Sequence, residues 1–354
     1  MIDKYLLLAR SNINEYVKKA IFDVYQNNIE DGLKILNKIA TYVPSIQDIK
    51  TEIAVTLRNN CSFIPINDSS YPTLLKNIAS APIVLTVKGN KKNLLKNIIA
   101  IAGTREPEND DFFLIQQISK MVGEIGFIVA SGLARGSDCI AHLNSIQSGT
   151  MAIMAHGLNM CYPKDHKILF DEILDNNGTI ISEYSWYTRP AQLSFVKRNR
   201  ILTGISLATI IARARKQKCG TIITAEYAKK FNRPLYTILP KGENLGNLYL
   251  LKTNIAKQIT NLEILRYNLL LDCLNANKKI KKEKHNTVLF CEEEKEKLDI
   301  EKTKFEILKI LKINKINKLT QNNFIKVYNL ILHSLNINDI LIKQCLLEIS
   351  YDNN

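Results

Sequence analysis

The sequence predicts an α/β protein built around a doubly wound, mostly parallel sheet. Between residues 98 and 253, short apolar runs alternate with helix-length amphipathic segments. The runs are apolar on both faces, which is typical of strands buried between two layers of helices. The chain has 354 residues, 46% of them apolar and 23% charged, so it can form a large core with smaller domains attached.

Residues 1–60 are predicted to be helical. Apolar positions such as Ile21, Val24 and Tyr25 recur at three- and four-residue steps, and Pro44 is expected to end one helix. This region indicates a small helical bundle with no visible chemistry. Residues 62–90 contain three prolines and short apolar runs, and we expect an extended lead-in with one short helix.

The regular part of the sequence predicts six strands and six helices in alternation. The predicted strands are IIAIAG (98–103), FIVASG (127–132), MAIMAHG (151–157), TIISEY (179–184), LATIIARA (207–214) and PLYTILP (234–240). The predicted helices lie near 110–124, 137–147, 165–176, 193–204, 221–231 and 246–253. Strands and helices in this order imply parallel strands joined by crossover helices.

Composition excludes several classes of protein. No apolar run approaches the roughly 18–20 residues that span a bilayer, and the first residues lack the features of an export signal. The seven cysteines are scattered and form no C-x-x-C pair, which argues against a disulfide framework or a zinc site. We expect a cytoplasmic protein with no membrane association.

The charge distribution points to a polyanionic partner. The net charge is +14, and residues 193–233 contain ten basic residues and one acidic residue, Glu226. Such a local excess of positive charge favours an anionic ligand.

Glycine-containing loops follow the predicted strands, at the edge of the sheet where doubly wound folds bind ligands. Glycines allow backbone N–H groups to approach an anion, hydroxyls donate hydrogen bonds, and arginines offer planar forks that suit phosphate. The candidate phosphate-binding residues in the first two loops are Gly103, Thr104, Arg105, Ser131, Gly132, Arg135 and Gly136.

Two further segments supply candidate residues for binding an anionic ligand. Lys164 and Lys167 lie at the start of a predicted helix, with Phe170 one turn later as a possible stacking partner for a base. The alternative is that the lysines are solvated and Phe170 belongs to the core. In the basic segment, Arg198, Asn199 and Arg200 cannot all face one way, so we expect one to point inward and the others to face a ligand.

Catalytic and cofactor motifs are missing from the sequence. There is no G-x-G-x-x-G, Walker sequence, nucleophile elbow or H-E-x-x-H. Asp138 and His142 are four residues apart, and we expect a hydrogen bond between them to hold the glycine loop. We therefore predict no catalytic residue, no metal and no cofactor.

Several motifs in order resemble the DNA processing protein A family (DprA, also called Smf). They are GTR, SGLARGSDCIAH, GLNMCYPKDHKILFDEI, SEY, FVKRNRILTGIS and GTIITAEYA, within roughly residues 65–255. The resemblance implies an extended Rossmann-like core, often preceded by a helical domain and followed by a small winged-helix domain. On that basis the chain divides into a helical domain (1–62), the core (63–260), a charged linker (261–306) and a degenerate winged-helix-like remnant (307–354).

The resemblance also implies the roles of individual residues. Arg105 and Lys167, with Lys164 as the other candidate, would hold DNA phosphates, and Phe170 would lie beside a base. The SGLARG loop and residues 198–200 would shape the pocket. The sequence departs from the family at Ala214-Arg215, Cys219-Gly220-Thr221 and Pro240-Lys241.

The resemblance implies a homodimeric, non-enzymatic protein that binds single-stranded DNA. It would protect the strand and load the RecA recombinase onto it, as in competence and natural transformation. The alternative is a nucleotide-processing enzyme of the lysine-decarboxylase-like phosphoribohydrolase type, whose motif is echoed by Gly220, Thr221 and a displaced Glu226. A third possibility is a protein-interaction partner without DNA affinity.

Overall fold

The computed structural model describes residues 1–239, 241–242, 244–276, 307, 311, 324–334, 342–343 and 345–347. They fall into two compact units, which are treated separately. One contains the described parts of Met1–Ala54, Ala79–Val84 and Thr287–Asn354, and the other contains Val55–Ile78 and the described parts of Leu85–Asn286.

The first unit is helical. The helices at its N-terminal end are α1 (Ile2–Arg10), α2 (Glu15–Tyr25), α3 (Ile29–Ile39) and α4 (Ile46–Arg58), the last of which continues into the second unit from Val55, and α14 (Phe324–Ser334) lies in its C-terminal part. A largely buried ion pair joins Arg10 to Glu52 at 2.8 Å, and Lys343 contacts Asp23 of α2 at 2.8 Å. The helices predicted for residues 1–60 are confirmed.

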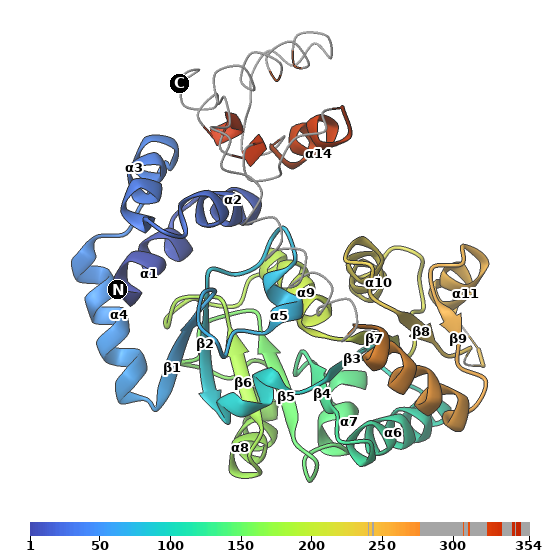
Figure 1. The fold of residues 1–354 in the computed structure, drawn as a ribbon. Helices are drawn as coiled ribbons and strands as arrows, with labels where there is room; N and C mark the ends of the chain where they lie inside the picture. Colours follow the sequence, from blue (N-terminus) through green and yellow to red (C-terminus); the bar gives the residue numbers. More distant parts are fainter. Residues whose placement is uncertain are drawn as a thin grey trace. The chain divides into compact units, whose positions relative to one another are not determined.

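The second unit contains a sheet, which has nine strands among the described residues, in the order β1-β2-β6-β5-β4-β3-β7-β8-β9 (Figure 1). The strands are β1 (Cys61–Pro65), β2 (Val84–Gly89), β3 (Ile98–Ala102), β4 (Ile128–Ser131), β5 (Thr150–Met154), β6 (Thr179–Ser182), β7 (Ala208–Ile211), β8 (Leu235–Thr237) and β9 (Lys257–Gln258). Neighbours from β6 to β9 pair in parallel, and β2 is antiparallel to β6. The predicted mostly parallel sheet is confirmed.

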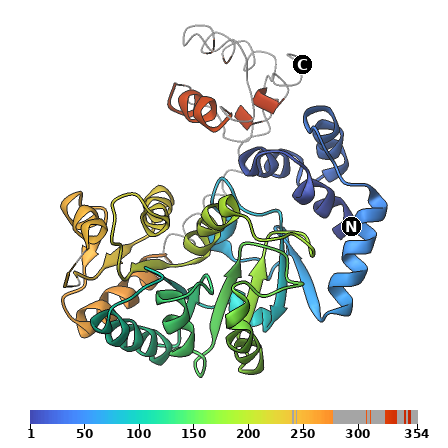
Figure 2. The same ribbon diagram turned by 180° about the vertical axis from the view of Figure 1, so that it is seen from behind.

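Helices cover both faces of this sheet. The helices are α5 (Thr73–Lys76), α6 (Asn109–Glu124), α7 (Ser137–Leu143), α8 (Lys167–Asp175), α9 (Gln192–Ile205), α10 (Gly220–Lys230) and α11 (Leu245–Lys252), with short 3₁₀ turns at Lys91–Leu95 and Lys164–His166. Figure 1 shows α6, α7 and α8 along one side of the sheet and α9, α10 and α11 along the other, and Figure 2 shows the same division from behind.

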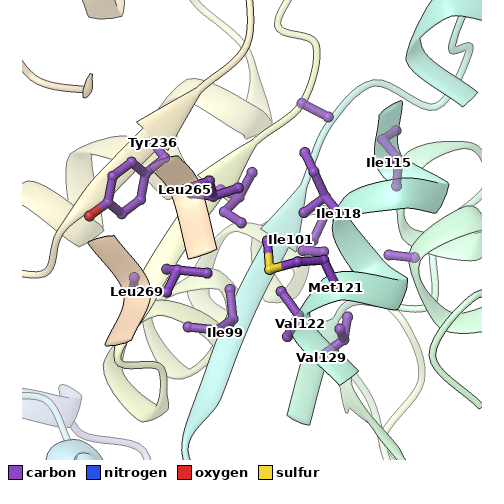
Figure 3. Close-up of a cluster of buried hydrophobic side chains, with 14 of the residues drawn as sticks. Ile99, Ile101, Ile115, Ile118, Met121, Val122, Val129, Tyr236, Leu265 and Leu269 are labelled. Carbon is purple, nitrogen blue, oxygen red and sulfur yellow. The ribbon is translucent and has the colours of Figure 1, made fainter. Parts of the chain in front are cut away.

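Alternating residues of the central strands build the core. Ile99 and Ile101 of β3 face α6 and pack against Ile118 and Val122, as Figure 3 shows. A second cluster lies under α8 and includes Leu169, Phe170 and Ile173 with residues of β5 and β6. Because both faces of each central strand are buried, the continuous apolar runs of the sequence are required here.

The region after the predicted core differs from the prediction. Residues 262–276, which the sequence assigns to a charged linker, form a helix instead. Leu265 and Leu269 of this helix are buried in the core beside Tyr236 (Figure 3). The remaining linker residues, 277–306, lie outside the described residues, as does most of the predicted winged-helix-like remnant.

Candidate nucleic-acid interface

The strand order places the ends of β3 and β7 side by side at the centre of the sheet. After β3, the chain adds β4, β5 and β6 on one side of β3, and it then adds β7 on the other side. Doubly wound folds bind ligands at the point where the strand order reverses in this way. A cavity of about 460 Å³ lies there. We call it the switch-point cavity. It is lined by residues that follow β3, β4 and β7, and by residues of α9 and α10.

The loop after β3 contributes Gly103, Thr104 and Arg105 to the cavity. The Thr104 carbonyl accepts hydrogen bonds from the backbone N–H and the hydroxyl of Ser137, both at 3.0 Å. A methyl group on Gly103 would come within 2.4 Å of the Ser137 Oγ, so this close contact requires glycine. Arg105 is exposed and has no ion-pair partner among the described residues, so its guanidinium is available to a phosphate.

The loop after β4 is held from within by Asp138. The buried Asp138 carboxylate accepts hydrogen bonds from the N–H groups of Gly132 at 3.0 Å and Ala134 at 3.3 Å. Burial raises the pKa of Asp138 above its ordinary value, while these hydrogen bonds and Arg198 oppose the change. Ser131 donates to the Ile101 carbonyl at 2.6 Å. The expectation that Ser131 offers its hydroxyl to a ligand is therefore wrong.

The predicted hydrogen bond between Asp138 and His142 is also absent. His142 is fully buried, and its Nδ1 lies 2.8 Å from the Thr150 Oγ1. Burial lowers the pKa of His142 to about 3, which keeps the ring neutral. Asp138 holds the glycine loop as expected, but through backbone N–H groups.

Gly136 brings the loops after β3 and β4 together. It has a φ of +75°, and a methyl group there would lie 2.5 Å from the Arg105 backbone. The loop therefore needs glycine both for its backbone conformation and for this contact.

Arg198 crosses the loop at Gly132. Its side chain is buried and Nη1 donates to the Ile153 carbonyl at 2.5 Å. A methyl group on Gly132 would lie 1.9 Å from that nitrogen, so only glycine leaves room for the guanidinium. Burial lowers the pKa of Arg198, whereas nearby Asp138 raises it. Arg198 both supports the loop and lines the cavity.

The neighbours of Arg198 on α9 have different roles. Arg200 is buried and paired with Glu183, so it does not face a ligand. The expectation that only one residue of 198–200 points inward is therefore wrong, because both arginines do. Asn199 lines the cavity, and its Nδ2 donates to the Gly220 carbonyl at 3.4 Å.

The lysine segment lies outside the cavity lining but is attached to the loop after β4. Arg135 pairs with Asp165, and the His166 Nδ1 lies 2.9 Å from the Leu133 carbonyl. Lys164 is exposed, and Lys167 is exposed and pairs with Asp171.

Phe170 does not have its expected role. Only 5% of its surface is exposed, and it belongs to the core cluster under α8. The Lys167 Nζ lies 5.8 Å from the centre of its ring. The ring cannot stack on a base in this conformation, which corrects the expectation; the alternative of a core phenylalanine is confirmed.

The cavity has further lining residues besides the phosphate-binding candidates of the first two loops. Arg215 lines the cavity and pairs with Glu106 at 3.2 Å, and Lys216 lines it without an ion-pair partner in the described part of the chain. Phe195 of α9 also lines the cavity, with its ring 5.5 Å from that of Tyr162. Arg215 and Lys216 belong to the basic excess of residues 193–233, which the sequence predicts to favour an anionic ligand, and they line the cavity together with Arg105.

No group of three or more His, Cys, Asp or Glu side chains that could hold a metal ion occurs within the described ranges. Among the helices described, none has the length and apolar character needed to cross a membrane.

Residues 62–269 match the sequence family described as DNA recombination-mediator protein A. The chain belongs to this family. The matched range includes every residue that lines the switch-point cavity.

Curated relatives of the recombination-mediator family are similar over the same region. Protein Smf of Synechocystis is 35% identical over 187 residues, which are 51% of this chain and 46% of that protein. The DNA processing protein DprA of Bacillus subtilis is 30% identical over 221 residues, which are 61% of this chain and 73% of that protein. The match thus spans about half the length of the Synechocystis relative.

Two solved structures of DNA processing protein A share the fold. The Helicobacter pylori protein, described with a single-stranded DNA binding mode, has a TM-score of 0.56 and 28% identity, and the match covers 60% of this chain and 96% of that one. The Streptococcus pneumoniae protein has a TM-score of 0.62 and 24% identity, and the match covers 73% of this chain and 95% of that one. The chain therefore has the α/β fold of this family of recombination mediators.

Proposed function

We propose that this chain binds single-stranded DNA along the loop edge of its core, protects the strand, and loads the RecA recombinase onto it, as in natural transformation. The observation that carries this proposal is the switch-point cavity, where Arg105 has no acidic partner among the described residues and Lys216 lies on the same lining. Family membership supports the same function, as does the single-stranded DNA binding described for the H. pylori relative.

Phosphate contacts supply most of the affinity in this proposal. Guanidinium groups bind phosphate oxygens through paired hydrogen bonds, and such contacts do not depend on base sequence. Arg105 is the first contact at the cavity, and Lys164 and Lys167 extend the positive edge beyond Arg135. For base stacking we propose Phe195 with Tyr162 in place of Phe170, because Phe195 lines the cavity.

The test is a titration of a fluorescent oligothymidylate with the full chain and with Arg105→Ala. We expect the variant to bind about tenfold more weakly, because one charge-assisted contact to a phosphate is lost. Lys167→Ala is expected to weaken binding to a lesser degree, since Asp171 already neutralises part of its charge. The control is Arg58→Ala, an exposed arginine at the end of α4.

Unchanged binding by Arg105→Ala would contradict the proposed interface, and failure of the unmodified chain to bind at modest salt would contradict the function. RecA loading has its own measurement: the rate of RecA assembly on a strand already coated with single-strand-binding protein. We expect this chain to accelerate assembly and Arg105→Ala to accelerate it less. If the unmodified chain does not accelerate RecA assembly, the proposal that it loads RecA is contradicted.

We also propose that the chain acts as a homodimer. The helix over 262–276 buries one face in the core and exposes an apolar stripe of Ile264, Tyr267, Leu271 and Leu274, between 36% and 63% exposed. We call these four residues the apolar stripe. An exposed stripe that covers three helical turns favours protein contact, and a two-fold dimer would bury it against its own copy.

The phosphoribohydrolase alternative depended on Glu226. That residue is exposed on α10 and is not one of the residues that line the cavity. The two acidic residues of the lining are already engaged: Glu106 pairs with Arg215 and Asp138 holds the loop after β4. We therefore do not propose nucleotide hydrolysis.

A further inference from the structure

A basic segment joins β2 to β3. Residues 69–105 contain six basic residues and no acidic residue, and four of the six lie within residues 88–96. Of these four, Lys91, Lys92 and Lys96 are exposed, and none of the three forms an ion pair with a residue that the structure describes. We call these three residues the opposite-edge lysines. Like charges this close repel one another, so a bound polyanion would lower their energy.

The opposite-edge lysines lie at the end of the sheet away from the switch-point cavity. Lys96 comes just before β3, which begins at Ile98, whereas Arg105 comes just after the strand ends at Ala102. The length of β3 alone puts about 15 Å between these two ends. No residue of 88–96 lines the cavity, although both belong to the same compact unit. The chain therefore has a second basic surface, separate from the first.

Hydrogen bonds to the start of β6 hold this segment in place. Asn93 is buried, and its Nδ2 donates to the Asn177 carbonyl at 2.8 Å and lies 3.0 Å from the Thr179 Oγ1. The Asn90 N–H donates to the Gly178 carbonyl at 2.9 Å, and the Asn90 carbonyl accepts from Thr179 Oγ1 at 2.7 Å. The lysines are thus displayed from an anchored backbone, which lowers the entropy lost when they bind a partner.

The acidic residues that end the neighbouring helices do not neutralise these lysines. Glu124 at the end of α6 and Asp175 at the end of α8 are exposed, and neither pairs with a described lysine. The positive charges are spread over an exposed surface, which suits a polymer with repeated negative charges better than one small anion. Lysine ammonium groups bind phosphates as point charges, without reading base sequence.

We propose that the opposite-edge lysines bind phosphates of the same strand that is held at the switch-point cavity, so that one long single strand contacts both ends of the sheet. That the ligand is single-stranded DNA rests on the proposed function. Once the strand is held at the cavity, its contact with the lysines is intramolecular, and two linked contacts bind more tightly than either alone. A short strand occupies only the cavity end, so the contribution of these lysines depends on strand length.

The experiment measures anisotropy with the full chain and labelled oligothymidylates of about 6 and about 40 nucleotides, the shorter being of the size that one binding groove covers. We expect the double variant Lys91→Ala/Lys92→Ala to bind the long strand about tenfold more weakly and the short strand as the unmodified chain does. For the long strand, the slope of log affinity against log salt should fall in magnitude by about 1.4, because two phosphate contacts are lost.

The matched control is Lys229→Ala/Lys252→Ala, which removes two exposed lysines at the ends of α10 and α11, outside both surfaces. It is expected to bind both strands as the unmodified chain does. Unchanged binding of the long strand by Lys91→Ala/Lys92→Ala would overturn the inference, as would equal weakening for both strands or an equal effect of the control.

The number of short strands bound at saturation is a second measurement. We expect one per chain; two per chain would show that the lysines hold a separate strand, which would also overturn the inference. If only this inference fails, the short strand still binds and Arg105→Ala weakens its binding, whereas neither strand binds if the proposed function fails.

Discussion

The buried histidine of α7 makes stability depend on pH. His142 has a pKa of about 3 in the folded chain, against 6.5 when it is exposed. Between these values the unfolded chain binds a proton that the folded chain does not, so stability falls as pH falls through this window. At up to about 1.4 kcal/mol per pH unit, this residue removes about 2 kcal/mol of unfolding free energy between pH 7 and pH 5.

We therefore expect His142→Gln to flatten the pH dependence. Urea unfolding at pH 7, 6 and 5 measures the free energy of both chains, and the loss on acidification should be about 2 kcal/mol smaller in the variant. Ile140→Val on the same helix is the control, because it removes a buried methyl and lowers stability by a similar amount at each pH. Parallel pH curves for His142→Gln and the unmodified chain would show that His142 does not cause the dependence.

At single residues, the direction of a side chain limited what the sequence could predict. The spacing of Leu169, Phe170 and Ile173 is that of a buried helical stripe, so a signal for burial of Phe170 was present. For Arg198 and Arg200 no such signal exists. Their burial depends on Gly132 and Glu183, which are distant in sequence and meet them only in the fold.

Among the helices, the one over 262–276 has a distinct exposed face. In a two-fold dimer each apolar contact occurs twice, so Leu274→Glu would remove two buried leucines at about 2 kcal/mol each. We expect the dimer dissociation constant to rise by about three orders of magnitude, with monomer seen by light scattering at micromolar concentration.

Leu143→Glu is the control for the dimer prediction, since Leu143 is similarly exposed, at 50%, on α7 rather than on the apolar stripe. It is expected to remain dimeric. If the unmodified chain is monomeric at every concentration tested, or if Leu274→Glu remains a dimer, the apolar stripe is not the interface.

The central strands were predictable because each is buried on both faces, so its sequence is a continuous run of apolar residues. β1 and β2 were less predictable, because their segment contains prolines and β2 joins the sheet antiparallel to β6. The neighbours of each strand were not predictable, since chain order does not give sheet order. The sequence therefore predicted that the basic residues of 193–233 favour an anionic ligand, but it did not show that Arg215 and Lys216 lie on the same cavity as Arg105.

For the whole molecule, the net charge of +14 and the number of phosphate contacts affect DNA binding differently. Net charge speeds encounter, whereas the salt dependence of affinity counts the counterions released where the protein touches phosphates. Each contact to a single strand contributes about −0.7 to the slope of log affinity against log salt. Removing a positive charge that makes no contact should leave this slope almost unchanged.

We therefore expect Arg105→Ala to reduce the magnitude of the slope by about 0.7, measured by anisotropy over a series of sodium chloride concentrations. Lys229→Ala removes the same charge from the exposed C-terminal end of α10, away from the cavity lining, and is expected to retain the slope. If both variants change the slope equally, affinity follows the overall charge and the loop edge is not a discrete phosphate-binding site. A change in Arg105→Ala alone places a phosphate at the junction of β3 and β7, because Arg105 lines the cavity there and Lys229 does not.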